Sequence, residues 1–264
     1  MKEQNNAINT NFFKKIFIKI CRILGYEIID QSNFYVPTQK KSLNEDLNVQ
    51  GKKSITLPLG ETKISRRVKA LTVIFRSCTN INMLTQNKSR LFDKEKSEYT
   101  FRSLNSILKS VTFCRSKMLN LNFNIIIVDH NSKQDDIKKM ENIIKKFDVK
   151  YEIINLNTNE FIDQINKTNS KNEKVSDNQL SNMSNIFKSF LLAKNDCKDL
   201  IYFVEDDYLH FKYSLEEMIG TYERIASQLE KDLIICPTDY PFLYMDNEKT
   251  NLLIGNKRHW RTTN

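Results

Sequence analysis

The chain has 264 residues, of which 40% are hydrophobic and 28% charged, a composition typical of one folded domain with an extension. No stretch approaches the roughly 18 uncharged apolar residues of a membrane-spanning helix, so the sequence excludes an integral membrane protein. The net charge of +9 indicates either an anionic partner or simply a composition rich in Lys, Asn and Ile, and no nucleic-acid-binding signature accompanies it.

The number and spacing of the glycines and cysteines further restrict the classes of protein to which the chain can belong. Only five glycines occur, and neither GxGxxG nor GxxxxGK followed by Ser or Thr is present, so the dinucleotide-binding and P-loop classes lose their main support. The five cysteines form no CxxC pair, which indicates reduced thiols in a cytoplasmic protein. None of the three histidines lies near a cysteine at ligand spacing, which argues against a zinc site.

The first predicted element is an amphipathic helix over residues 9–24, followed by Gly25 as its C-terminal stop. Its apolar and basic residues fall on opposite halves. This pattern is typical of a helix that lies in a membrane interface and contacts anionic lipid, or of one that docks its apolar face on its own domain. Residues 30–65 are polar and are expected to form a linker or an irregular arm, so we divide the chain into an N-terminal helix and linker (1–65) and a folded domain (66–264).

From residue 70 onward, predicted strands alternate with predicted helices. We expect helices between and after the strands, and a polar excursion over 157–180. The predicted strands are 70–75, 123–129, 149–156, 199–205 and 232–239, and the predicted helices are 97–111, 132–147, 182–195 and 214–229. This alternation predicts an α/β fold with a mostly parallel sheet flanked by helices.

In such sheets the ligand binds outside the carboxyl ends of the strands, so the residues that follow each strand are the candidates for a site. Three carboxylates in succession, Glu205, Asp206 and Asp207, follow the predicted strand 199–205. Neighbouring negative charges repel, and carboxylate oxygens suit Mg²⁺ or Mn²⁺, so the triplet indicates a divalent cation that also binds phosphate. The alternative is a solvated helix start, where acidic residues are common. The other candidates at this edge are Arg76, Ser77, Asp129, His130, Asn131, Ser132, Thr238 and Asp239.

The segments VIFRS, IIIVDHNS and LIYFVEDDY, in this order, resemble the GT-A glycosyltransferases, and most closely glycosyltransferase family 2. The resemblance covers roughly residues 68–240 and implies a GT-A fold, a nucleotide diphosphate sugar as donor, and Mn²⁺ or Mg²⁺ as cofactor. It implies that Asp129 holds the nucleobase, that Asp207 binds the metal, and that Glu205 and Asp206 face the ribose and the ion. His130 and Asn131 depart from the family pattern, which has a glycine in this loop.

Further residues complete the expected site. We expect Arg76 to meet the diphosphate, because a guanidinium matches phosphate geometry. The resemblance implies nucleotide contacts from Asn185 and Lys188, whose alternative is an exposed helix face. The complete nucleotide-binding set is Arg76, Ser77, Asp129, Asn131, Asn185, Lys188, Glu205 and Asp206.

The predicted general base is Asp239, whose alternative is a turn residue between Pro237 and Pro241. His259 is expected as a further metal ligand beside Asp207 and Glu205, and Trp260 as a stacking residue, with a loose tail as the alternative. The chain is expected to be an unusually short or C-terminally truncated member without a closing strand.

The function that these features predict is metal-dependent transfer of a sugar to an envelope polysaccharide or lipid-linked glycan at the cytoplasmic face of a membrane, without nucleic acid. A sugar nucleotidyltransferase is one alternative, but its basic, glycine-rich N-terminal loop is missing. A non-catalytic, glycosyltransferase-like binding or scaffold protein is the other.

Overall fold

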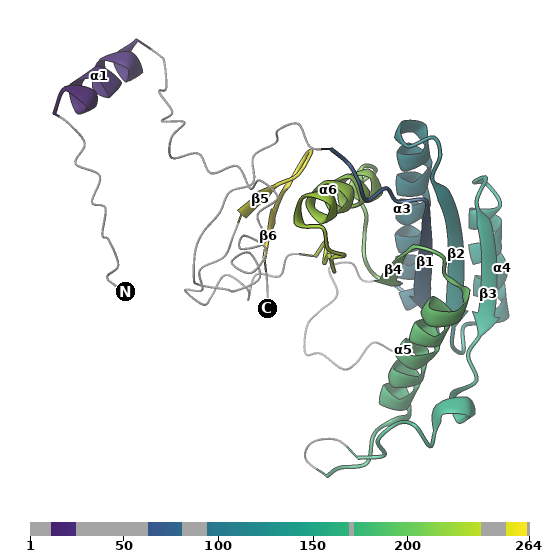
Figure 1. Ribbon diagram of the computed structural model, residues 1–264. Helices are drawn as coiled ribbons and strands as arrows, with labels where there is room; N and C mark the ends of the chain where they lie inside the picture. The colour runs from purple at the N-terminus through teal and green to yellow at the C-terminus, as the bar shows by residue number, and fades with distance from the viewer. Residues whose placement is uncertain (1–11, 25–62, 81–93, 169–171, 239–251, 263–264) are drawn as a thin grey trace.

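A computed structural model of the chain describes residues 12–24, 63–80, 94–168, 172–238 and 252–262 (Figure 1). Its centre is a four-stranded, all-parallel sheet in the order β3-β2-β1-β4. The strands are β1 (Ala70–Ser77), β2 (Asn122–Asp129), β3 (Lys150–Asn155) and β4 (Leu200–Glu205). Four of the five predicted strands and the parallel α/β class are therefore confirmed.

Helices cover both faces of the sheet, which explains why β1 and β2 read as nearly continuous apolar runs. One face packs against α3 (Lys96–Lys117), α4 (Gln134–Ile144) and α6 (Ser214–Leu229). The other packs against α5 (Asp177–Asp196) and the short 3-10 helix η2 (Thr158–Phe161). Successive side chains of β1 alternate between the two cores, with Val73 and Phe75 in the first and Ile74 in the second.

The order of the strands identifies where a ligand would bind. The chain proceeds outward from β1 to β2 and β3, and then returns to the other side of β1 to form β4. The direction of winding therefore reverses between β1 and β4. In open α/β sheets the crevice at such a reversal, outside the carboxyl ends of the strands, is the usual ligand site.

The predicted strand over 232–239 is wrong for the part that the structure describes, which ends at Thr238 and contains no strand. Leu233 and Ile235 pack against the core, whereas Ile234 is fully exposed. The alternation in the sequence therefore reports which side chains face the core, but the segment has no partner strand in the described sheet. Asp239 lies outside the described residues.

The C-terminal segment also differs from its prediction. Residues Leu252–Ile254 (β5) and His259–Arg261 (β6) form an antiparallel hairpin, where no strand was expected. The hairpin is held on α6 by the buried carboxylate of Glu217. This group accepts the backbone N–H groups of Lys257 (2.8 Å) and Arg258 (3.2 Å) and the indole N–H of Trp260 (3.1 Å). A Cβ at Gly255 would collide with Glu217, so glycine is required there.

The predicted N-terminal helix is present as α1 (Phe12–Ile23). Apolar side chains of this helix are exposed, among them Phe17 and Ile23. Residues 1–11 and most of the predicted linker, residues 25–62, lie outside the described residues. Within the described parts of the chain, no helix is both long and apolar enough to cross a membrane.

The contacts of Glu217 predict a specific effect of its removal. Glu217→Ala leaves three N–H groups without their acceptor, and each buried unsatisfied group costs about 1–3 kcal/mol. We expect a lower denaturation midpoint and a red shift of the fluorescence of Trp260, the single tryptophan of the chain. Glu216→Gln, one residue earlier, removes only an ion pair with Lys257 and should cost less than about 1 kcal/mol. Equal effects of the two substitutions would refute the anchoring role of Glu217.

Candidate functional site

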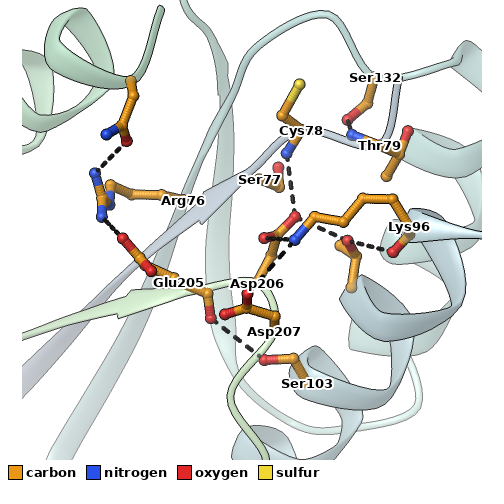
Figure 2. A network of polar contacts seen from close by, with 12 residues as sticks. Arg76, Ser77, Cys78, Thr79, Lys96, Ser103, Ser132, Glu205, Asp206 and Asp207 are labelled. Atoms are coloured by element: carbon orange, nitrogen blue, oxygen red, sulfur yellow. Dashed lines mark hydrogen bonds and ion pairs between the residues drawn. The ribbon is translucent and has the colours of Figure 1, made fainter. Parts of the chain in front are cut away.

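The carboxyl ends of β1 and β4 bring Arg76 and Glu205 together as neighbours in the sheet register. Their side chains form an ion pair, and the Arg76 guanidinium also donates to Asn182 Oδ1 of α5 at 3.2 Å (Figure 2). Arg76 therefore links both strands to the helix that covers this edge. Asn182 was not among the predicted residues.

The next residue, Asp206, points into the protein and is 7% exposed. Its carboxylate accepts the Lys96 ammonium at 2.6 Å, the Thr100 hydroxyl at 2.8 Å and the Cys78 backbone N–H at 3.2 Å (Figure 2). Burial raises the pKa of Asp206, while Lys96 and the two hydrogen bonds act in the opposite direction. Asp206 is thus an anchor that fastens the turn after β4 to the end of β1 and the start of α3, and its contacts are those of a structural residue.

Asp207 points outward again, within the turn that follows β4. Its side chain is 38% exposed, and its closest described cation is Lys96 Nζ, at 4.0 Å from Oδ2. The three carboxylates therefore do not form one cluster: Glu205 faces Arg76, Asp206 faces Lys96, and Asp207 remains open. The repulsion expected from the sequence is relieved by these two side-chain cations.

A stripe of polar residues on α3 continues these contacts along the chain that follows β4. Ser103 Oγ donates to the Glu205 carbonyl at 3.5 Å. Ser106 Oγ accepts the His210 backbone N–H at 3.0 Å, and Ser110 Oγ accepts the Leu215 N–H at 3.0 Å. Lys96 and Thr100 belong to the same stripe, whose spacing of three and four residues places it on one face of the helix. The stripe fixes the path from the acidic turn to α6.

His210 is enclosed at the centre of this path. Tyr202 Oη lies 2.8 Å from Nε2 and Ser106 Oγ lies 3.3 Å from Nδ1. Because the Ser106 hydroxyl donates to the Ser103 carbonyl, its oxygen accepts from Nδ1–H, and Nε2 accepts from Tyr202. Burial lowers the pKa of His210 to about 4, so the ring is neutral near pH 7.

The end of β2 carries a second anchored carboxylate. Asp129 is 1% exposed, and its Oδ1 accepts the hydroxyls of Ser77 (2.6 Å) and Ser132 (2.5 Å), while Oδ2 accepts the Ser132 N–H (3.2 Å). His130 Nδ1 lies 2.6 Å from the hydroxyl of Ser181 on α5. Asn131 adopts φ 59°, the left-handed region that glycine favours and that asparagine tolerates best among the other residues. The loop thus makes a tight turn without a glycine.

Of the remaining predicted residues, Asn185 contacts the end of β2, whereas Lys188 and His259 contact other elements. Asn185 is buried and donates to the Val128 carbonyl at 3.0 Å, and Lys188 pairs with Glu160 of η2 at 3.7 Å. Both attach α5 to its surroundings. His259 lies in β6, where it pairs with Ile254.

A metal site made only of protein ligands does not fit the residues that the structure describes. No group of three His, Cys, Asp or Glu side chains suited to a metal ion occurs among them. Mg²⁺, however, is commonly held by one or two carboxylates together with substrate phosphates. Asp207, which is 38% exposed, fits that arrangement as a single protein carboxylate, in which the substrate completes the coordination.

Cys78 ends β1 near these carboxylates. Burial, with the charges of Asp129 and Asp206, raises the pKa of the Cys78 thiol to about 11. The thiol is therefore protonated at neutral pH and is a poor nucleophile. This edge of the sheet therefore does not favour group transfer through a covalent cysteine intermediate.

Comparison of the chain with family models, with curated proteins and with solved structures finds no match.

The buried pair of Lys96 and Asp206 predicts a double-mutant effect. Lys96→Met leaves Asp206 as an uncompensated buried charge, and we expect a loss of about 3–5 kcal/mol in the free energy of unfolding. Adding Asp206→Asn removes that charge and should recover a large part of the loss. Urea denaturation measures both variants. Arg102→Ala breaks the exposed pair with Glu98 on the same helix and should cost less than about 1 kcal/mol. If Lys96→Met behaves like Arg102→Ala, the anchor is not formed in solution.

His210 predicts a dependence of stability on pH. Its pKa in the folded state, about 4, lies below the ordinary value of 6.5. Between these two pH values the unfolded chain binds a proton at this residue and the folded chain does not. This contribution to stability is complete above pH 6.5 and decreases by up to about 3 kcal/mol as the pH falls toward 4. His210→Gln should flatten the pH profile of urea denaturation over this range, whereas the exposed His259→Gln should not. Identical profiles for the parent and His210→Gln would contradict the assignment.

Proposed function

We propose that the chain is a glycosyltransferase with a GT-A-like domain that transfers a sugar from a nucleotide diphosphate sugar. The observation that carries this proposal is the arrangement at the β1–β4 reversal. An arginine, two outward carboxylates and the loop after β2 lie at one sheet edge, and the buried Asp206 anchor holds the turn between them.

The loop after β2 is the proposed nucleobase site. Oδ2 of Asp129 accepts one described hydrogen bond, the Ser132 N–H at 3.2 Å, and has acceptor capacity left for an N–H of the base. Because the side chain is 1% exposed, the proposal requires the Ser132 loop to move aside when the base binds. Ser77 keeps the carboxylate oriented, and the proposal assigns the side-chain amide of Asn131 to the base as well. Discrimination among bases would come from this hydrogen bond.

Arg76 is the proposed contact of the diphosphate. Its guanidinium is held at the edge by Asn182 and Glu205, and a planar fork of donors matches phosphate oxygens in pairs. When the diphosphate binds, Glu205 exchanges part of its contact with Arg76 for the ribose hydroxyls. Asp206 has no part in this binding, because its contacts are all internal.

Mn²⁺ or Mg²⁺ is the proposed cofactor, with Asp207 as its principal protein ligand and Glu205 beside it. When bound, the ion supplies positive charge to the diphosphate that leaves. In the transfer, an acceptor hydroxyl forms a bond to the anomeric carbon as the bond to the diphosphate breaks, and the hydroxyl proton passes to a carboxylate base. Asp239 remains the candidate base. An envelope polysaccharide or lipid-linked glycan remains the proposed acceptor, and α1, with its exposed apolar side chains, is the proposed peripheral contact with anionic lipid.

A calorimetric comparison of donor binding tests the proposal. The parent chain should bind one nucleotide diphosphate sugar, from a panel of UDP- and GDP-sugars, about tenfold or more tightly with Mn²⁺ than without it. Asp207→Asn should remove this metal effect, because it removes the charge of the proposed principal ligand. Asp163→Asn, an exposed carboxylate outside the site, serves as the matched control. A metal effect of equal size in Asp207→Asn and the parent would refute the metal assignment, and the absence of binding by every donor would refute the function.

A further inference from the structure

A group of aromatic and basic side chains lies where the chain enters α6 and meets the C-terminal hairpin. We refer to it as the aromatic–basic cluster, and it consists of Phe113, Phe211, Lys212, Tyr213, Lys257 and Arg258. The rings of Phe211 and Tyr213 are stacked, with centroids 5.6 Å apart and planes 3° from parallel. Phe211 is nevertheless 65% exposed, so much of this apolar surface faces solvent.

The cations of the cluster are fixed in place by these rings. The Arg258 guanidinium carbon lies 5.6 Å from the Phe211 centroid and 5.7 Å from the Tyr213 centroid, and its Nη2 donates to the Tyr213 hydroxyl at 2.5 Å. Lys212 and Lys257 both approach the ring of Phe113, at 5.7 and 5.5 Å. Stacking on aromatic rings leaves the charge of a cation intact.

The backbone beneath these cations is fixed as well. Glu217 holds the N–H groups of Lys257 and Arg258, so the hairpin presents their side chains from an ordered turn. Lys257 pairs with Glu216, but neither Lys212 nor Arg258 has a carboxylate partner among the residues that the structure describes. Within the described part of the chain, the charges of these two cations are therefore not neutralised by a carboxylate, and both can bind an anionic group.

The cluster is continuous with the acidic edge. After β4 the exposed side chains alternate with inward ones, so that Asp207, Leu209 and Phe211 face outward while Asp206 and His210 face inward. Four residues of extended chain span at most about 14 Å, and this bounds the distance between the backbones of Asp207 and Phe211. A chain-like ligand bound on the cluster can thus reach the edge where transfer is proposed.

We infer that the aromatic–basic cluster is an acceptor subsite for an acidic glycan, a polysaccharide whose sugar units carry carboxylate groups. This inference rests on the proposed function and names the class of its acceptor. The exposed aromatic surface packs against the apolar face of a sugar ring, and Arg258 and Lys212 bind the carboxylates. A neutral glycan would leave both cations without a partner.

Titration with an oligogalacturonate and with its fully methyl-esterified form tests the inference. Trp260 lies two residues after Arg258 in β6 and is the single tryptophan, so its fluorescence reports binding on the hairpin. The parent chain should bind the acidic oligomer and not the ester, and its affinity should fall as salt rises. Arg258→Gln and Phe211→Ala should each weaken binding by about tenfold or more. Phe211→Ala removes an exposed side chain, so this variant should fold. It therefore tests the subsite even if Arg258→Gln does not fold.

Two matched controls and a donor assay separate the possible failures. Phe190→Ala removes another exposed aromatic ring, on α5, and Lys150→Ala removes an exposed lysine of β3; both should bind the oligomer like the parent. The subsite is overturned if the acid and the ester bind equally, or if Arg258→Gln binds the oligomer like the parent. It is also overturned if the chain binds anionic lipid vesicles but not the soluble oligomer. Binding of nucleotide sugars is measured in the same variants. If no nucleotide sugar binds, the proposed function is wrong. If nucleotide sugars bind but the chain does not distinguish the acid from the ester, only the subsite is wrong.

Discussion

The ion pair between Asp206 and Lys96 is the constraint on which the rest of the site depends. Three carboxylates in succession could not share one edge if all faced the same way, because their charges would repel. Turning the middle one inward removes it from that edge, but a buried carboxylate needs a compensating cation and hydrogen bonds. Lys96, Thr100 and the Cys78 N–H supply them. Glu205 and Asp207 consequently point outward from a turn whose backbone is fixed from below.

One helix organises most of this region. α3 contributes apolar side chains to the core beneath the sheet and, on an adjacent face, the polar stripe that begins at Lys96. The stripe follows the chain from the end of β4 to the start of α6, so the acidic turn, His210 and the start of α6 are held by one rigid element. The hairpin then depends on α6 through Glu217. A disturbance at α3 therefore reaches both the proposed donor edge and the aromatic–basic cluster.

Apolar patterning predicted the sheet well because β1, β2 and β4 are strongly apolar runs between polar segments. It also located α6 at its observed bounds, 214–229. The same patterning failed at 232–238. Exposed and partly buried side chains alternate there, but the segment has no partner strand in the described sheet. The site was only partly predictable: Arg76, Glu205 and Asp207 follow from their positions after strands. Lys96 and Asn182 do not, because each lies on a helix far along the chain, and only the packing of that helix brings it to the edge.

The central position of β1 has a consequence for how the protein is made. The partner of β1 on one edge, β2, begins about fifty residues after the start of β1. The partner on the other edge, β4, begins about 130 residues after it. At typical rates of synthesis this delay lasts roughly ten seconds, during which a strand that is largely buried in the folded protein presents an unpaired edge. Contacts between such distant segments also slow folding, since a large loop must close first. Until β4 has been synthesised, the nascent chain is therefore open to self-association through the free edge of β1.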